Sequence, residues 1–281
     1  MNTSHLPQDQ FINIGSVTTR YWATGSTGPP LIFVHGLGQF TENWMYNITA
    51  LAQHFRVYAP DLAGFGKSDK PDAPFTYDYF AQFLNDFMSA MNIPEAHLIG
   101  HSLGGAVLLR LAMDFPDHVN NLVLVGSEGL GEDAALIFRL LSLPLIGELL
   151  ARPSRNGTEK LYTEAIYDEN IITGELIDLG YRMASLPGAK KAFLKTLGIT
   201  TNFSGYKSEV IDPIRLHLDK VQVPALITWG EHDKFHPVAE AHFAGQHLPD
   251  ASLHIFDKCG HVPMIEYPEK FNTAVIRFLS G

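Results

Sequence analysis

The residues best suited to chemistry are a serine, a histidine and a carboxylate that lie far apart along the chain. Ser102 stands in Gly100-His101-Ser102-Leu103-Gly104, a G-x-S-x-G motif between a short apolar run and a helical pattern. A sharp strand-to-helix turn exposes a serine hydroxyl, and the helix behind it points its N-terminal amides at any nearby oxyanion. This context predicts that Ser102 is a nucleophile.

A serine hydroxyl reacts only if a base takes its proton and a third group orients that base. His261 lies in Cys259-Gly260-His261, in a loop between the strand that ends at Phe256 and the last helix. Catalytic groups collect at the carboxyl edge of open α/β sheets, so this loop and Ser102 share an edge. We favour Asp233 as the orienting acid, because it follows the preceding strand, and Glu128 stays open as the second candidate.

The elements that must position these groups alternate between strand and helix. Short apolar runs without polar alternation are typical of parallel strands covered on both faces. We predict a hairpin, then alternating strands and helices, which together indicate a doubly wound, mostly parallel α/β sheet. The predicted strands are 11–14, 17–22, 31–34, 56–60, a short run from 98 that ends in the motif, 119–125, 225–229 and 252–256. The predicted helices are 41–53, 77–91, one that starts behind Ser102 and includes 106–112, 237–247 and 268–279.

The alternation stops in the middle of the chain. Residues 129–212 show only helical segments, at 134–143, 158–167, 173–184 and 188–197. We therefore predict two units, a core formed by 1–128 and 213–281 and a helical cap inserted at 129–212. Ten apolar side chains crowd the stretch from Leu136 to Leu150, and we expect most of them to form the core of the cap.

Composition excludes several kinds of partner. Asp and Glu number 30 against 20 Lys and Arg, which gives a net charge of −10 and an isoelectric point near 5.7. Nucleic acids and anionic membranes require basic surfaces, so neither is an expected partner. The most apolar segment, 134–150, is interrupted by Arg139, Pro144 and Glu148, so we expect no stable membrane insertion.

The single cysteine, Cys259, allows no intramolecular disulfide, and the first ten residues lack the basic start and apolar segment of a signal peptide. Both observations predict a cytoplasmic protein. His232, His236 and His242 lie near Glu231, but they do not form a convincing set of metal ligands. We therefore predict neither a metal nor another cofactor.

The chain resembles the α/β-hydrolase superfamily, and within it the capped group with a serine nucleophile. The resemblance covers nearly all of the chain outside the insertion. It rests on His35-Gly36-Leu37-Gly38, on the turn at 61–68, on the G-x-S-x-G motif, and on the turns that hold Asp233 and His261. It implies that the backbone amides of Leu37 and Leu103 form the oxyanion hole. A hole of two rigid amides needs no reorganisation when charge develops on the acyl oxygen.

The resemblance and the apolar cap together predict a carboxylic ester hydrolase for lipophilic small molecules with short to medium acyl chains. One alternative is a carbon–carbon bond hydrolase of ring-fission diketo acids, because residues 125–131 resemble the segment that follows the sixth strand in those enzymes. Those enzymes usually carry an Asn where this chain has His101 and a Trp where it has Val262. A second alternative is a ligand receptor of the same fold with little turnover.

Overall fold

The computed structural model describes residues 6–281, and its centre is an eight-stranded sheet in the order β1-β2-β4-β3-β5-β6-β9-β10. β2 pairs antiparallel with β1 and with β4, and all other neighbours are parallel. The strands are β1 (Gln10–Ile14), β2 (Val17–Thr24), β3 (Pro30–Val34), β4 (Arg56–Pro60), β5 (Ala96–His101), β6 (Val119–Val125), β9 (Ala225–Gly230) and β10 (Ala251–Phe256). The predicted mostly parallel sheet is confirmed.

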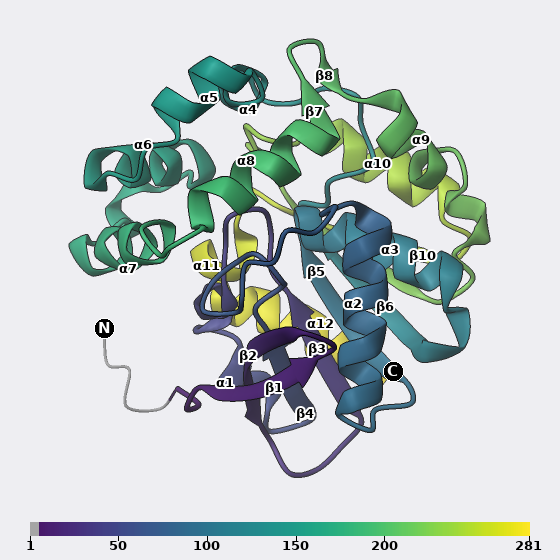
Figure 1. The fold of residues 1–281 in the computed structure, drawn as a ribbon. Helices are drawn as coiled ribbons and strands as arrows, with labels where there is room; N and C mark the ends of the chain where they lie inside the picture. Colours follow the sequence, from purple (N-terminus) through teal and green to yellow (C-terminus); the bar gives the residue numbers. More distant parts are fainter. Residues whose placement is uncertain (1–5) are drawn as a thin grey trace.

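Helices cover both faces of this sheet. Figure 1 shows α2 and α3 in front of the strands and α12 behind them. The core helices are α1 (Ile48–Leu51), α2 (Tyr77–Ala90), α3 (Leu103–Asp114), α10 (Val238–His247), α11 (Pro263–Glu266) and α12 (Pro268–Ser280). Short 3₁₀ turns are formed by η1 (Thr41–Trp44), η2 (Pro116–His118), η3 (Glu169–Ile171) and η4 (Leu218–Lys220).

Strand β3 illustrates why its sequence is apolar throughout. Successive side chains of a strand point to opposite faces, so a sheet that is covered on both sides needs apolar residues at every position. Ile32 and Val34 pack into the core beneath α2 and α3, whereas Leu31 and Phe33 pack into the second core with α1 and α12. All four side chains are fully buried.

The sheet brings five loops to one edge. β3 pairs with β4 on one side and with β5 on the other, so the chain reverses its direction of travel across the sheet at β3. Ligands of open α/β sheets bind at the carboxyl ends of the strands around such a switch point. The loops after β3, β5, β6, β9 and β10 leave from this edge and carry all the residues predicted to do chemistry.

One predicted helix is broken in the structure. The segment 41–53 forms η1 and α1 with a turn between them, rather than a continuous helix. Asn47, in that turn, is fully buried and donates from its side-chain amide to the backbone oxygen of Met264 and to Asn272. These hydrogen bonds to distant residues account for the interruption, and they cannot be predicted from the neighbouring sequence.

The middle of the chain is mostly helical, as predicted, and lies along one edge of the molecule in Figure 1. It contains α4 (Leu136–Leu141), α5 (Pro144–Leu150), α6 (Arg155–Ala165), α7 (Gly174–Ala184), α8 (Ala189–Thr200) and α9 (Ser208–Arg215), with a small hairpin of β7 (Thr201–Asn202) and β8 (Gly205–Tyr206). The boundaries of the cap at 129 and 212 stay a prediction, and residue 212 lies inside α9.

The expectation that the apolar residues of α4 and α5 form a cap core was wrong for most of them. Leu141 is 9% exposed, but Leu145 is 88% exposed. Among the ten, large exposed side chains are Leu136, Ile137, Leu145, Ile146, Leu149 and Leu150. The two helices are short and pack mainly against each other and α8, so one face of each points to solvent.

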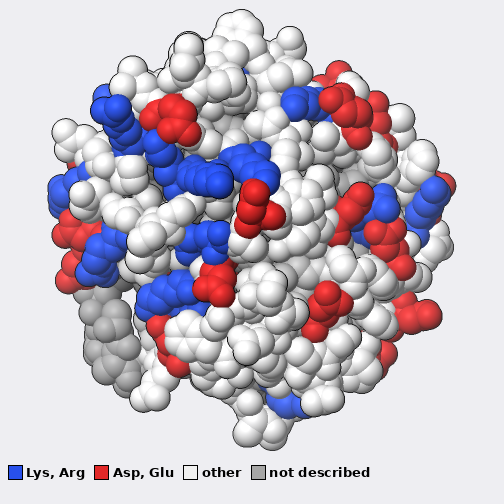
Figure 2. All heavy atoms as spheres, in the orientation of Figure 1, with Lys and Arg blue, Asp and Glu red and all other residues white. Residues whose placement is uncertain are grey.

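Charged side chains of both signs are interspersed over the face drawn in Figure 2, with Lys and Arg gathered toward the side of the cap helices. Several of these cations pair with acids. Lys190 on α8 pairs with Glu148 on α5, and Lys195 on α8 pairs with Asp72 in the loop between β4 and α2. Within the described residues, no helix has the length and apolar character needed to cross a bilayer.

Candidate active site

Ser102 lies at the sharp turn between β5 and α3, as predicted. Its φ is +54° and its ψ is −120°, a conformation that non-glycine residues rarely adopt and that concentrates at functional sites. The flanking glycines are required by close backbone approach. A Cβ at Gly100 would lie 2.5 Å from the oxygen of Gly104, and one at Gly104 would lie 2.4 Å from the oxygen of Val34.

His261 and Asp233 meet in a buried hydrogen bond. Nδ1 of His261 lies 2.7 Å from Oδ2 of Asp233, and both residues are almost completely buried. The other carboxylate oxygen, Oδ1, accepts from the backbone amides of Phe235 at 2.8 Å and His236 at 3.0 Å. Since a carboxylate only accepts, Nδ1 carries the proton, and Nε2 is left free to act as a base.

Backbone contacts hold Ser102 beside this pair. The amide of Ser102 donates to the oxygen of Val125 at 2.9 Å. A Cβ on the next residue, Gly126, would lie 3.1 Å from Nδ1 of His261 and 3.3 Å from Oδ2 of Asp233. No hydrogen bond joins the Ser102 hydroxyl to His261 among residues 6–281, and such catalytic bonds often tighten only when substrate binds.

His101 ties the nucleophile turn to the histidine loop. Its ring lies 4.5 Å from the ring of His261, centre to centre, and its Nε2 donates to the backbone oxygen of His261 at 2.9 Å. Burial holds the pKa of His101 well below its ordinary value, with the neighbouring His261 acting in the same direction. A neutral imidazole is therefore part of the scaffold at this position.

Glu128, the second candidate for the orienting acid, has another partner. Its Oε1 accepts from the hydroxyl of Tyr77 at 2.6 Å, and burial raises its pKa. Its backbone amide donates to the oxygen of Ser102 at 3.0 Å, which keeps it close to the turn. Of the two carboxylates left open by the sequence, Asp233 is the one hydrogen-bonded to His261.

The loop after β3 lies against Ser102. A Cβ at Gly36 would be 3.0 Å from Cβ of Ser102, and the amide of Gly36 donates to Oε1 of Gln39 at 2.9 Å. The amides of Leu37 and Leu103 donate no hydrogen bond to any described residue. Two unpaired amides on rigid segments can stabilise an oxyanion.

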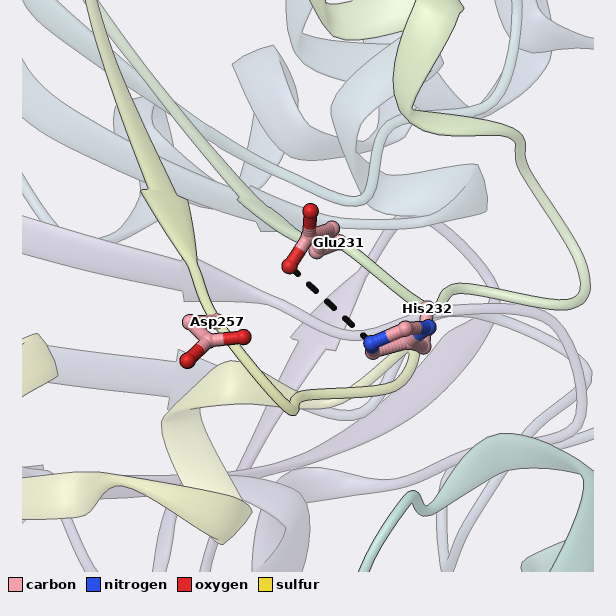
Figure 3. A group of neighbouring side chains, drawn as sticks. All are labelled: Glu231, His232 and Asp257. Carbon is pink, nitrogen blue, oxygen red and sulfur yellow. Dashed lines mark ion pairs between the residues drawn. The ribbon is translucent and has the colours of Figure 1, made fainter.

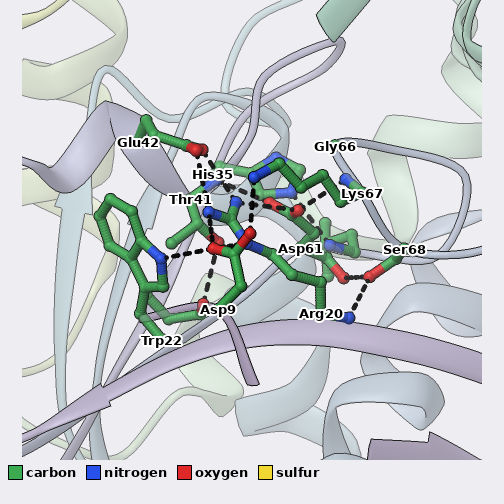
Figure 4. Close-up of polar contacts among 12 residues, drawn as sticks. Asp9, Arg20, Trp22, His35, Thr41, Glu42, Asp61, Gly66, Lys67 and Ser68 are labelled. Carbon is green, nitrogen blue, oxygen red and sulfur yellow. Dashed lines mark hydrogen bonds and ion pairs between the residues drawn. The ribbon is translucent and has the colours of Figure 1, made fainter. Parts of the chain in front are cut away.

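The far end of this loop is anchored by a buried cation that sequence reasoning missed. Arg20 on β2 binds both carboxylate oxygens of Glu42 at 2.8 Å and contacts Asp61 at 3.2 Å (Figure 4). Asp61 also accepts from the amide of Thr41 at 2.7 Å. The signal was a lone arginine in an otherwise apolar or uncharged strand.

Aromatic rings cover the site from the cap side. The ring of Phe235 lies 5.1 Å from that of His261, and Phe138 on α4 lies 5.0 Å from Phe235. Phe193 on α8 packs over the loop after β3, because a Cβ at Gly38 would lie 2.9 Å from its ring. These contacts place apolar side chains beside His261 and over the loop after β3.

Two further groups of polar side chains lie at the same edge. One group consists of the exposed residues Glu231, His232 and Asp257 (Figure 3). Their possible ligand atoms lie within 4.8 Å of one another, so a cation could bind there. Separately, His236 and Glu240 are buried, and the ring of His236 lies 5.4 Å from that of His261. Sequence reasoning weighed His236 only as a metal ligand and did not single out Glu240. Their spacing of four residues at the start of a helix was the available signal.

Comparisons with known proteins identify the family of the chain. The family model described as alpha/beta hydrolase fold matches residues 29–168. A 2-hydroxy-6-oxo-6-(2'-aminophenyl)hexa-2,4-dienoic acid hydrolase of Metapseudomonas resinovorans is 36% identical, over 97% of this chain and 91% of the relative. A structure of a serine hydrolase involved in carbazole degradation is 33% identical, with a TM-score of 0.80 over 98% of this chain and 99% of that one.

A structure of a putative lipase of Acinetobacter baumannii is 25% identical, with a TM-score of 0.85 over 97% of this chain and 91% of that one. The family model ends at residue 168, but the match to the Metapseudomonas resinovorans hydrolase covers 97% of this chain. That match includes the loops that carry Asp233 and His261. The chain therefore belongs to the α/β-hydrolase family.

Proposed function

We propose that this hydrolase cleaves a carbon–carbon bond next to a ketone in ring-fission keto acids, with Ser102 as nucleophile, His261 as base and Asp233 as the orienting acid. The relative of Metapseudomonas resinovorans is named for such a substrate and matches almost the whole chain. That match carries the choice of substrate class. The 2.7 Å contact between His261 and Asp233 supports the assigned roles.

The proposed reaction begins when His261 takes the proton of Ser102 and the oxygen attacks the ketone carbon. The amides of Leu37 and Leu103 hold the negative oxygen of the adduct. The adduct then collapses: the carbon–carbon bond breaks, its electron pair passes into the conjugated keto group of the leaving fragment to give a dienolate, and the dienolate takes the proton from His261. Water, activated by His261, finally releases the acid from Ser102. Asp233 stays ionised and stabilises the cationic imidazole.

Lipophilic ester hydrolysis, our first expectation from the sequence, is the second candidate. The chain has His101 and Val262 where carbon–carbon hydrolases usually carry Asn and Trp. The rings of Phe138 and Phe235 beside His261 also suit an apolar acyl group. An ester uses the same attack and the same oxyanion hole, and its alcohol takes the proton from His261.

Turnover of two substrate sets separates these functions. The wild type is assayed with a vinylogous diketone acid and with a p-nitrophenyl ester series, and kcat/KM is compared. We expect the diketone acid to be the better substrate, and a higher kcat/KM for the esters would overturn the choice in favour of the second candidate. Ser102→Ala serves as control for both, because neither reaction survives without the nucleophile. Turnover of neither set by the wild type would favour a ligand receptor instead.

A further inference from the structure

A buried ion pair lies next to His261 and takes no part in the proposed reaction. It consists of His236, in the loop after β9, and Glu240, in the first turn of α10. Nδ1 of His236 lies 3.4 Å from Oε2 of Glu240, and both side chains are at least nine-tenths buried. The two atoms have no hydrogen-bond partner among the described residues, so their attraction is electrostatic.

The position of His236 is fixed from several sides. Its backbone amide donates to Oδ1 of Asp233 at 3.0 Å, and its backbone oxygen accepts from Nε1 of Trp229 at 2.9 Å. Its ring stacks on Tyr206, with 5.9 Å between ring centres, and lies 5.4 Å from the ring of His261. A charge on His236 would therefore act on His261 across a short, dry path.

The groups around His236 favour its charged form. Burial alone lowers the pKa of His236, but Glu240, Asp233 and Glu128 outweigh burial and raise it to about 9. Burial raises the pKa of Tyr206, so its hydroxyl stays neutral.

Two neutral groups complete the surroundings. Burial keeps the ring of His101, on β5, neutral, and burial also raises the pKa of Tyr77, on α2, whose hydroxyl binds Glu128. The charged group beside these neutral ones is the ring of His236, 5.4 Å from the ring of His261 and paired with Glu240.

We propose that His236 is a positioning residue that holds a positive charge beside His261 and so sets the lowest pH at which His261 can act as the base. A neighbouring cation opposes protonation of His261. His261 then stays neutral, and able to accept the serine proton, in more acidic solution than it would without this neighbour. The inference rests on the proposed role of His261.

The test is the pH dependence of the reaction of Ser102 with a fluorophosphonate, in which the serine oxygen bonds to phosphorus and fluoride leaves. This probe needs no natural substrate. In His236→Asn, we expect the acidic limb of the rate profile to move to higher pH by about one unit, because the cation is lost while the Glu240 carboxylate remains. Glu240→Gln removes the acid that keeps His236 charged, and its limb should move in the same direction.

His242→Asn is the matched control, because His242 is exposed on α10, the helix that carries Glu240, and the limb of this variant should not move. Nitrogen NMR of the imidazoles gives a second readout: the ring of His236 should be a cation at pH 7 in the wild type and neutral in Glu240→Gln. A neutral His236 in the wild type, or unmoved limbs in both variants, would overturn the inference. A wild type that is not labelled at any pH would instead refute the proposed function.

Discussion

Replacing Arg20 by Met should destabilise the protein more than any surface charge change. The guanidinium of Arg20 is completely buried and contacts three carboxylates, those of Asp9, Glu42 and Asp61. Figure 4 shows these acids converging on it from separate segments of the chain. A methionine fills much of the same volume but leaves Asp61, also fully buried, without its cation.

The magnitude follows from the burial. Removing one partner of a buried ion pair costs about 3–5 kcal/mol, because an uncompensated charge is left in a poorly solvated place. That amount corresponds to a fall in Tm of roughly 10 °C for a domain of this size. Arg110→Met is the matched control. Arg110 also contacts two acids, Asp78 and Asp114, at 2.8 Å, but on the surface, so its loss should cost under about 1 kcal/mol.

Urea denaturation at pH 7, followed by circular dichroism, measures both variants against the wild type. The Arg20→Met/Asp61→Asn double variant should recover part of the loss, since it removes a charge that the single variant strands. Equal stabilities for Arg20→Met and Arg110→Met would refute the reasoning. A double variant that is clearly less stable than Arg20→Met would also refute it, because Asp61→Asn would then add a loss of its own instead of relieving a stranded charge.

Three further predictions follow. In Asp233→Asn, the new amide faces Nδ1 of His261, so the proton moves to Nε2 and kcat should fall by about 10⁴-fold without loss of fold in circular dichroism. Burial raises the pKa of Asp9, but hydrogen bonds from Lys67 and Arg20 outweigh burial and lower it to about 2. Its contribution to stability is therefore complete above about pH 4 and is lost as pH falls toward 2, which urea midpoints across that range would show. Leu141→Ala should cost about 2 kcal/mol in thermal unfolding and Leu145→Ala under about 0.5, and equal costs would contradict their assigned burial.

The sequence predicted the sheet well because its strands carry their own signal. The runs at 31–34 and 122–125 are apolar at every position, a pattern typical of a strand covered on both faces. The two-residue connection Gly15-Ser16 likewise indicated the first hairpin, in which Ile14 pairs with Val17. These elements depend on local residues, so local reasoning reached them.

The errors arose where distant contacts decide the outcome. The break in the helix at 41–53 depends on Asn47, whose side chain is bound by residues more than 200 positions away. The exposed leucines of α4 and α5 show the opposite case: apolar composition predicted burial, but the fold provides no surface to cover those faces. Periodicity records which residues share a face, not what that face meets.

The same contrast between local signals and distant contacts holds for the residues of the candidate site. Motifs singled out Ser102, His261 and Asp233, because each stands in a characteristic turn at a strand end, and the structure has these turns at one edge of the sheet. Arg20 was missed and His236 was weighed only as a metal ligand, because the partners of each are buried acids that only the fold brings together. A buried charge becomes visible only when the partners that compensate it are known.

The central claim is that Ser102, His261 and the amides of Leu37 and Leu103 surround a single reacting carbonyl. A crystal structure of the protein after reaction with a phosphonate tests this claim directly, because the phosphonyl group imitates the tetrahedral adduct. We predict a bond from phosphorus to Oγ of Ser102, a phosphonyl oxygen about 2.7–3.1 Å from both amides, and Nε2 of His261 within hydrogen-bond reach of Oγ. Phosphorus on another residue, or an oxygen that points away from both amides, would contradict it.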